Sequence, residues 1–321
     1  MFEFDLIARI RARAATRGDV ILGIGDDAAL LQPPTGMQLA VAMDTLNAGV
    51  HFPPETAAAD IGWKALAVNL SDLAAMGAQP AWCTLSLSLP EADAGFVDGF
   101  LDGFLALAQQ HDVALVGGDT TRGPLSISVT AHGFVEPGTA LRRDGAQVGD
   151  DIWVSGTLGD ARLALAGYRV EQELAPADLL MAGVRMHTPT PRVALGCALA
   201  EAGLAHAAID ISDGLVGDLG HILKASQVGA TLDVDALPAG PVLARQETSL
   251  RRRYTAAGGD DYELCFTASA SSREAIAALA ASCGTPVTRV GRIEAQSGLR
   301  LVDAAGLPLD LALSSFDHFS E

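Results

Sequence analysis

The sequence has no long apolar run and few basic residues, and each shortage excludes a class of protein. No uninterrupted apolar stretch reaches the roughly 18 residues of a membrane-spanning helix, because Lys64 and Asp72 interrupt the longest candidate. At the N-terminus, Glu3 and Asp5 precede the arginines, which is the wrong order for a secretory signal. We therefore expect a soluble protein of the cytoplasm.

Basic residues are scarce relative to acidic ones. Lysine and arginine together number 21, against 39 aspartates and glutamates, and the formal net charge is −18. A chain of this charge repels nucleic acids and anionic membrane surfaces, so neither is expected as a partner. If the protein binds phosphates, metal ions must lie between the negative charges.

Several common functional motifs are missing as well. The four cysteines (Cys83, Cys197, Cys265 and Cys283) form no CxxC pair, which argues against a zinc site and a disulfide framework. The sequence contains no GxxxxGK[ST] phosphate loop and no HRD or DFG of protein kinases. Residues 23–28 match GxGxxA, but Asp26 and Asp27 would repel the pyrophosphate of a dinucleotide.

The length and hydrophobic content predict two folded domains. A chain of 321 residues with 49% hydrophobic residues can fill two cores. Helical and strand-like patterns occur in both halves, which predicts an α/β (α+β) class and excludes all-α and all-β folds. The segment 136–150 is rich in glycine, proline and charge, so we place the boundary there, with domains 1–140 and 141–321.

The hydrophobic periodicity predicts individual elements. Helices are expected over 4–15, 56–76, 96–110, 160–166, 178–186, 192–202, 214–226 and 273–281, and strands over 39–43, 81–89, 113–116, 125–135, 152–155 and 262–267. The first of these strands is expected to deliver Asp44 at its end. The third is expected to open into a loop with Gly117, Gly118 and Asp119.

Aspartates recur beside glycines or small residues at the ends of expected elements. They are Asp26, Asp27, Asp44, Asp72, Asp119, Asp210, Asp213, Asp260 and Asp261. A single Gly-Asp pair is an ordinary turn, but glycine also permits a close backbone approach to a ligand. If these carboxylates converge, hard oxygen donors without His or Cys clusters predict Mg²⁺. Mg²⁺ bridging phosphate oxygens is what phosphoryl transfer needs.

One spacing occurs twice. Asp72 and Asp119 are 47 residues apart, and so are Asp213 and Asp260. Each pair joins a Ser-Asp to a Gly-Gly-Asp. Two related domains and chance are equally good explanations.

Seven strings, in order from about residue 5 to 319, resemble the thiamine-monophosphate kinase family. They are GIGDDAAL, MDT followed by His51, KALAVNLSDLAAMGAQP, GGDTTRGP, DISDGLVGDLGHI, GGDDYELCFT and FDHF. The resemblance implies an aminoimidazole-ribonucleotide synthetase-like fold, with an N-terminal domain that pairs across a homodimer and a C-terminal α/β domain. It implies a kinase of thiamine diphosphate biosynthesis that transfers the γ-phosphate of ATP, with several Mg²⁺ ions, to thiamine monophosphate.

The resemblance also implies roles for single residues. Metal ligands would be Asp27, Asp44, Asp72, Asp119, Asp210 and Asp213, with the backbone carbonyls of Ala42 and Met43 where relatives often have Ser or Thr. ATP would contact Gly118, Asp119, Arg143 and Ser212, and the substrate would contact His51, Asp260 and Phe316. Asp260 stands where many relatives have a glutamate, so a water is expected to extend its shorter reach. No general base is expected, because the acceptor phosphate is already ionised and metals with Arg143 assist the transfer.

The implied roles divide between the domains, with ATP, Mg²⁺ and dimer contacts in 1–140 and the rest of the nucleotide and substrate site in 141–321. Two alternatives stay open. One is another ATP-using enzyme of the superfamily, such as aminoimidazole-ribonucleotide synthetase. Selenophosphate synthetase is expected to have a reactive cysteine near the N-terminus, whereas the first cysteine here is Cys83, and the hydrogenase-maturation protein is expected to end in a cysteine, whereas this sequence ends in Glu321. The other is a module that binds MgATP through the same aspartates without catalysis.

Overall fold

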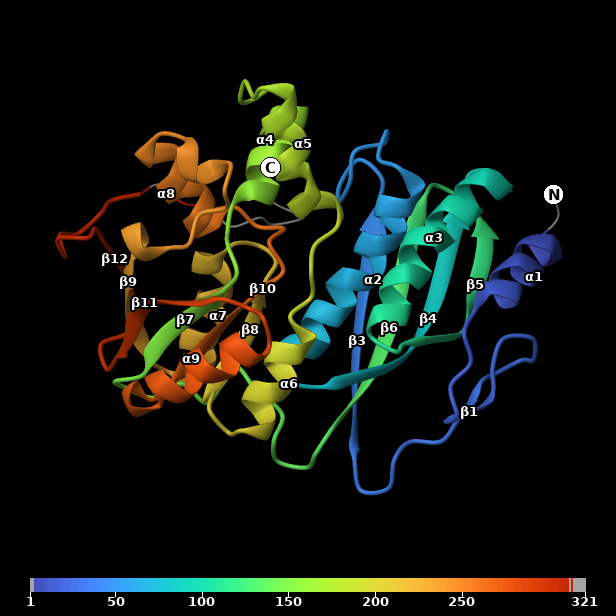
Figure 1. Cartoon of the computed structure of the whole chain (residues 1–321), viewed down its shortest axis with the longest axis horizontal. Coiled ribbons are helices and arrows are strands. Elements are labelled where there is room, and N and C mark those ends of the chain that lie inside the picture. Colours follow the sequence, from blue (N-terminus) through green and yellow to red (C-terminus); the bar gives the residue numbers. More distant parts are fainter. Residues whose placement is uncertain (1–2, 312, 314–321) are drawn as a thin grey trace. The chain divides into compact units, whose positions relative to one another are not determined.

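The computed structural model describes residues 3–311 and 313, and these residues form two compact units. Unit 1 comprises Met1–Leu73 and Ala78–Gly138, and unit 2 comprises Ala74–Gly77 and Thr139–Glu321. Figure 1 labels their elements. In the described part of the chain, no helix combines the length and the apolar character that a membrane crossing requires.

Unit 1 is built on a four-stranded sheet in the order β3-β6-β4-β5. The strands are β3 (Gln38–Asn47), β4 (Gln79–Leu89), β5 (Ala114–Arg122) and β6 (Ser126–Val135). β6 runs antiparallel to both β3 and β4, whereas β4 and β5 are parallel. The remaining elements are α1 (Glu3–Arg13), α2 (Ala58–Ala75), α3 (Ala94–Gln110) and a small ribbon of β1 (Val20–Leu22) with β2 (Leu30–Leu31).

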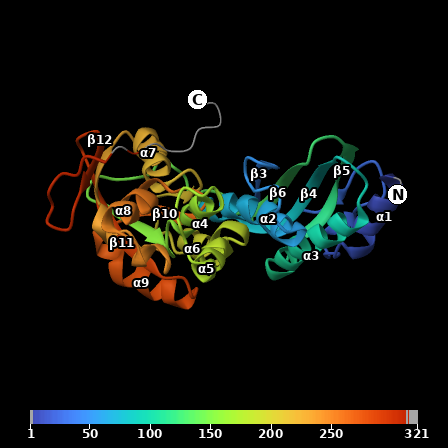
Figure 2. The same cartoon turned by 90° about the horizontal axis from the view of Figure 1, so that it is seen from above.

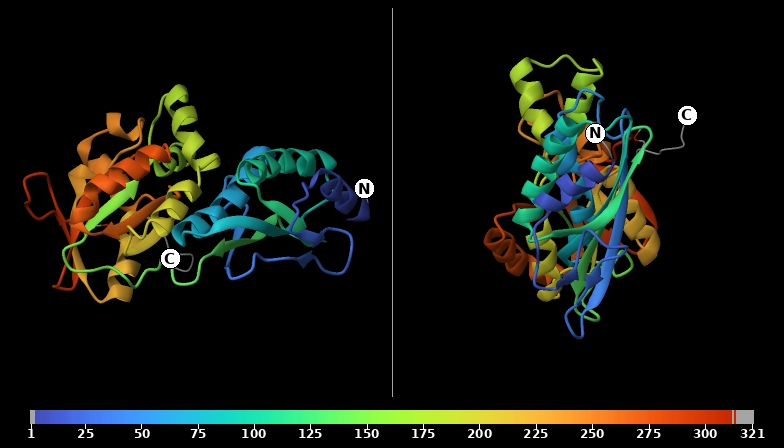
Figure 3. Two further views of the ribbon diagram at one scale, coloured as in Figure 1. Left: turned by 60° about the horizontal axis from the view of Figure 1, so that its bottom comes forward. Right: turned by 90° about the vertical axis from the view of Figure 1, so that its right-hand side faces the viewer.

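Helices α2 and α3 cover one face of this sheet (Figures 2 and 3). In α3, Phe100, Phe104 and Leu107 recur at helical spacing and are wholly buried, so the helix presents a continuous apolar stripe. The two helix backbones pack in direct contact. A Cβ at Gly62 would overlap the carbonyl of Phe100, and one at Gly103 would overlap that of Ala59. Glycine at both positions therefore fixes how closely α2 and α3 approach.

Unit 2 contains a six-stranded sheet in the order β12-β9-β11-β7-β10-β8. The strands are β7 (Asp151–Ser155), β8 (Ala207–Ile211), β9 (Gly229–Asp233), β10 (Glu263–Ala268), β11 (Val287–Glu294) and β12 (Gly298–Val302). Only the β12–β9 pair among them is parallel. The α-helices are α4 (Asp160–Tyr168), α5 (Pro176–His187), α6 (Val193–Glu201), α7 (Leu215–Ser226), α8 (Thr248–Ala257) and α9 (Arg273–Ser282), with short 3₁₀ turns at Val234–Ala236, Leu243–Arg245 and Ala270–Ser272.

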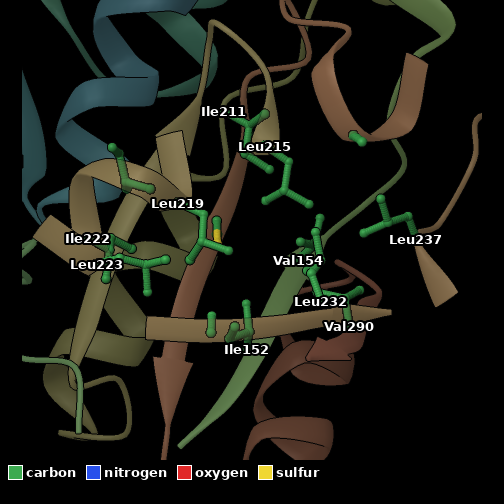
Figure 4. Packing of buried hydrophobic residues seen from close by; sticks show 14 of the residues in the cluster. Ile152, Val154, Ile211, Leu215, Leu219, Ile222, Leu223, Leu232, Leu237 and Val290 are labelled. Carbon is green, nitrogen blue, oxygen red and sulfur yellow. The ribbon is translucent and has the colours of Figure 1, made fainter. Parts of the chain in front are cut away.

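Helices α7 and α9 lie on opposite faces of the six-stranded sheet (Figure 2). Leu215, Leu219 and Ile222 of α7 recur every three or four residues and point into the core (Figure 4). There they join Ile152 and Val154 of β7 in one buried cluster. Burying each such side chain contributes about 1.5–3 kcal/mol, so this packing fixes the start of α7 relative to the sheet.

The predicted mixed helix and strand class is confirmed, but two predicted strand ends are wrong. Asp44 lies inside β3 rather than after it, and Gly117–Asp119 lie inside β5 rather than in a loop. The reason is sheet position: β3 and β5 are the edge strands, where polar side chains can stay exposed while backbone pairing continues. Helix α8 and strand β9 had no predicted counterpart.

The repeated spacing of 47 residues does not mark equivalent positions. Asp72 lies in helix α2 and Asp119 in strand β5, whereas Asp213 and Asp260 both lie in loops. The sheets also differ in strand number and order. Equal spacing therefore reflects no common placement of these aspartates.

Candidate functional site

In unit 1, one buried side chain connects the strand of Asp44 to the helix of Asp72. The backbone N–H of Asp44 donates to Oδ1 of Asn69, with the two atoms 3.0 Å apart. Asn69 is wholly buried on α2, and its amide donates to the carbonyl of Ala65 at 3.0 Å. Asn69 lies three residues before Asp72, so this amide holds β3 beside the segment of α2 that carries the second carboxylate.

Asp119 is presented by the other edge of the same sheet. Its side chain is exposed on β5 in register with Ser86. The preceding Gly118 has a φ of 151°, and a Cβ there would overlap the carbonyl of Leu85. Only glycine fits this close approach of β5 to β4. The position of Asp119 thus depends on the residue before it.

The sheet order does not bring Asp44 and Asp119 together within one copy of the chain. Asp44 pairs with Val129 of β6, Val129 with Leu85 of β4, and Leu85 with Gly118 of β5. Three strand spacings therefore separate the two positions, or about 14 Å along the sheet. Carboxylates that far apart cannot ligate one metal ion.

The other unit 1 candidates lie in loops and on the edge strand. Asp27 is exposed, and its N–H donates to Oδ1 of Asp26 at 2.9 Å. Ala42 and Met43 lie within β3, in register with Ala131 and Thr130.

His51 follows β3 and is held at both its ring and its backbone. Its Nδ1 accepts the N–H of Asn47 at 2.9 Å, and its carbonyl accepts Nζ of Lys64 at 3.0 Å. A neutral His51 therefore carries its proton on Nε2. Lys64 is buried on α2. Its role was not predicted, and its only sequence signal is a lysine within an apolar run.

In unit 2, the loop after β8 gathers three carboxylates. Asp210 lies near the end of β8, which is buried throughout, and Asp213 follows in the loop. Oδ2 of Asp218, in the first turn of α7, accepts the N–H groups of Ser212 and Asp213 at 3.1 and 3.2 Å. Burial raises the pKa of Asp218 to about 7, and the negative charges of Asp210 and Asp213 add to this rise. The loop thus holds an excess of negative charge that a cation would relieve.

Asp218 was not among the predicted residues. The available signal was the third acidic residue of DISDGLVGD, five positions after Asp213.

Residues 258–262 bring Asp260 to the same loop. The N–H of Asp260 donates to the carbonyl of Ser212 at 2.7 Å, and the N–H of Tyr262 donates to that of Ile211 at 2.8 Å. Asp260 and Tyr262 have φ values of 64° and 50°, in the left-handed region that residues other than glycine rarely adopt. Unit 2 therefore does bring Ser212, Asp213 and Asp260 together.

Arg143 is placed elsewhere in unit 2. Its carbonyl accepts the hydroxyl of Ser226, at the C-terminal end of α7, at 2.9 Å. Asp218 lies at the start of α7, about 12 Å away along the helix axis. The guanidinium of Arg143 makes no salt bridge with any residue that the structure describes. The backbone of Arg143 therefore lies at the opposite end of α7 from the loop that contains Ser212.

One finding limits the metal prediction. Within residues 3–311, no three His, Cys, Asp or Glu side chains are arranged to hold a metal ion by themselves. Mg²⁺ commonly uses one or two carboxylates and completes its shell with water and substrate phosphate oxygens. The pair Asp44 and Asp72 and the pair Asp210 and Asp213 are therefore still compatible with Mg²⁺. Phe316 lies outside the described residues.

Comparison with known proteins gives the family. Residues 25–135 match the AIR synthase related protein, N-terminal domain, and residues 147–304 match the C-terminal domain. Thiamine-monophosphate kinase of Salmonella typhimurium is 47% identical over 325 residues, covering 99% of this chain and 98% of the relative.

Two solved structures agree with this likeness. The crystal structure of thiamine-monophosphate kinase from Stenotrophomonas maltophilia is 58% identical, with a TM-score of 0.87 over 94% of this chain and 96% of that one. The structure of AaThiL complexed with AMPPCP and TMP is 30% identical, with a TM-score of 0.77 over 98% and 96%. These relatives match both units of the chain over nearly its full length. The chain therefore belongs to the thiamine-monophosphate kinase family.

Proposed function

We propose that this protein transfers the γ-phosphate of ATP directly to the phosphate of thiamine monophosphate, giving thiamine diphosphate and ADP. The observation that carries the proposal is the full-length match to thiamine-monophosphate kinases, including the AaThiL structure complexed with AMPPCP and TMP. AMPPCP is an analogue of ATP, so that complex pairs the donor with the acceptor. The reaction forms one P–O bond and breaks one, and both nucleophile and leaving group are phosphate oxygens.

Mg²⁺ would be held by two groups of aspartates. Asp27, Asp44, Asp72 and Asp119 would serve in unit 1, with the carbonyls of Ala42 and Met43, and Asp210 and Asp213 would serve in unit 2. The chemistry that Mg²⁺ would supply there is neutralisation of the charge that develops during transfer. The gathering of Asp210, Asp213 and Asp218 at one loop supports a cation there, because a positive charge would relieve the repulsion among these carboxylates.

The protein's own groups would position the two substrates. Gly118 and Ser212 would contact the nucleotide, and Arg143 would donate to its phosphate oxygens. His51 and Asp260 would contact thiamine monophosphate. Phe316 is proposed to stack on a thiamine ring. No general base is assigned, because the attacking phosphate oxygen is ionised near neutral pH.

We also propose a homodimer in which β5 of one copy completes the site of β3 and α2 in the other. Leu39, Val41 and Met43 form an apolar row on edge strand β3 and are 48%, 58% and 62% exposed. Such a row is typical of a surface that another copy covers. The arrangement would also bring Asp119 of one copy beside Asp44 of the other, whereas the two residues lie about 14 Å apart within one chain.

We place the reaction in the cytoplasm, where ATP is the phosphoryl donor. Cys83 and Cys265 are buried thiols, as is usual in a reducing compartment.

The direct test is an assay of the purified chain with ATP, Mg²⁺ and thiamine monophosphate, followed by phosphorus NMR. Free thiamine serves as a parallel acceptor. We expect thiamine diphosphate from the monophosphate only, with one ADP formed per product. Binding of MgATP without product would contradict the kinase function and favour a non-catalytic module.

A further inference from the structure

A wholly buried carboxylate stands directly behind the loop of Asp260. Glu263 begins β10, and its side chain is inaccessible to solvent. Oε2 accepts the hydroxyl of Ser155 and Nε of Arg192, both at 2.6 Å. Oε1 accepts Nη2 of Arg192 at 2.5 Å and Nη2 of Arg185 at 2.8 Å. Two arginines and a hydroxyl therefore hold one carboxylate.

Arg185 extends this cluster to the loop backbone. The same Nη2 that binds Glu263 also donates to the carbonyl of Asp261 at 2.9 Å. The carboxylate of Asp261 is buried too, and its Oδ1 accepts the N–H of Gly159 at 2.8 Å. The loop is thus fixed from inside the unit at two points, by Arg185 of α5 and by the turn between β7 and α4.

The outer side of the loop faces Ser212. Asp260 and Tyr262, which alternate with the anchored residues, keep left-handed backbone conformations. Their N–H groups donate to the carbonyls of Ser212 and Ile211. A side-chain-bearing residue holds such a conformation only when its surroundings over-determine it. The buried anchors on Asp261 and Glu263 supply that constraint, because they alternate along the chain with Asp260 and Tyr262.

Stability alone does not account for the cluster. Replacing a buried ion pair by packed apolar residues is often neutral or stabilising, so such a pair is weak evidence for a stabilising role. Nε of Arg185 is also buried without a hydrogen-bond partner among the described residues. An arginine that leaves one donor unsatisfied while bridging a carboxylate and a carbonyl is better suited to fixing a geometry.

We propose that Arg185 is a positioning residue that, through Glu263 and the carbonyl of Asp261, sets the loop of Asp260 against Ser212. The proposal rests on the assignment of Asp260 to the thiamine monophosphate site. Arg185 touches neither substrate in this view. Its loss leaves Asp260 in the chain but no longer in place, so binding of the acceptor weakens while the transfer step is less affected.

The kinetic test compares Arg185→Met, Arg185→Lys and a matched control. Arg273→Met also removes an arginine from a buried carboxylate, because Arg273 binds Asp151 of β7 through Nε at 2.5 Å and Nη2 at 2.8 Å, but it does not contact the loop. For Arg185→Met we expect KM for thiamine monophosphate to rise about tenfold, with kcat within about threefold of wild type. Arg185→Lys keeps the charge with a shorter reach, so we expect an intermediate KM. Arg273→Met is expected to leave KM unchanged.

Hydrogen exchange tests the same proposal without activity. In Arg185→Met, hydrogen exchange of a peptide covering 258–263 should rise. The loop is then no longer held in the position where the N–H groups of Asp260 and Tyr262 reach their carbonyl partners. Exchange of β9 should stay as in wild type, and Arg273→Met should not affect the loop. Unchanged loop exchange and KM in both Arg185 variants would overturn the proposal. If Arg185→Met does not fold, Arg185→Lys decides. A wild type without kinase activity contradicts the proposed function, while the exchange experiment still tests the anchor.

Discussion

The two units position their acidic residues in different ways. In unit 1, Asp44 and Asp119 lie on strands and Asp72 on a helix, so regular backbone hydrogen bonding places each side chain. In unit 2, Asp213 and Asp260 lie in loops, and the loops are held by other side chains, chiefly Asp218 and Arg185. A carboxylate on a regular element depends on register, whereas one in a loop depends on single buried polar groups.

This difference has an electrostatic side. Three buried acids of unit 2 accept backbone N–H groups, and burial raises the pKa of Asp160, Asp218 and Asp261 above the usual value. In all three, hydrogen bonds from backbone N–H groups partly oppose the rise. Precise loop geometry in unit 2 is therefore obtained at a cost in desolvation that the strands of unit 1 avoid.

The largest expected effect is on turnover in unit 1. Asp72→Asn removes a proposed metal ligand from a half-exposed position on α2 without changing side-chain volume. We expect kcat to fall about 10²–10⁴-fold while the unfolding temperature stays within a few degrees of wild type. Steady-state kinetics and thermal unfolding measure the two quantities. Near-normal turnover would remove Asp72 from the site.

A mixing experiment tests whether unit 1 is complete in a single copy. Asp72→Asn and Asp119→Asn are each expected to be nearly inactive alone. If β5 of one copy completes the site of the other, heterodimers contain one intact site, and an equimolar mixture should recover about a quarter of wild-type activity. The mixture is assayed after subunit exchange. No recovery would mean that each copy uses its own Asp72 and Asp119.

Dependence on register is tested at Gly118. Gly118→Ala places a Cβ on the carbonyl of Leu85, so β5 must shift. We expect a loss of about 2–4 kcal/mol in the free energy of unfolding, with reduced activity because Asp119 moves too. The control is Gly220→Ala on α7, where a Cβ meets open space. Alanine there should stabilise the helix by about 0.5–1 kcal/mol. Chemical denaturation compares the two, and equal effects would contradict the steric argument.

The last expected effect is a pH dependence of stability in unit 2. The folded state keeps a proton on Asp218 up to a pKa of about 7, whereas the unfolded chain releases it near 3.8. Stability therefore falls as pH rises between these values, by at most about 4 kcal/mol. Asp218→Asn should remove this component when denaturation is measured from pH 4 to 7.5 in a chelator. Parallel profiles for variant and wild type would show that Asp218 is not perturbed.

Periodicity and motif spacing were sufficient for most of the fold. The apolar stripe of α3 and the buried run of β7 follow from the preferences of single residues for water or the interior. The same reasoning predicted that β3 stops before Asp44 and that β5 stops before Gly117. Both predictions were wrong, because polar residues on an edge strand have the same sequence pattern as a loop. It gave no place to α8, a helix with three consecutive arginines.

The sequence by itself determined the class of fold, the excess of acidic residues and the family resemblance, since these depend on which residues are present and in what order. Only the tertiary structure decided which aspartates meet. Strand order separates Asp44 from Asp119, and two backbone hydrogen bonds join the loop of Asp260 to Ser212 and Ile211. Such contacts join residues distant along the chain, and they form only when burial of the whole core pays for ordering the backbone.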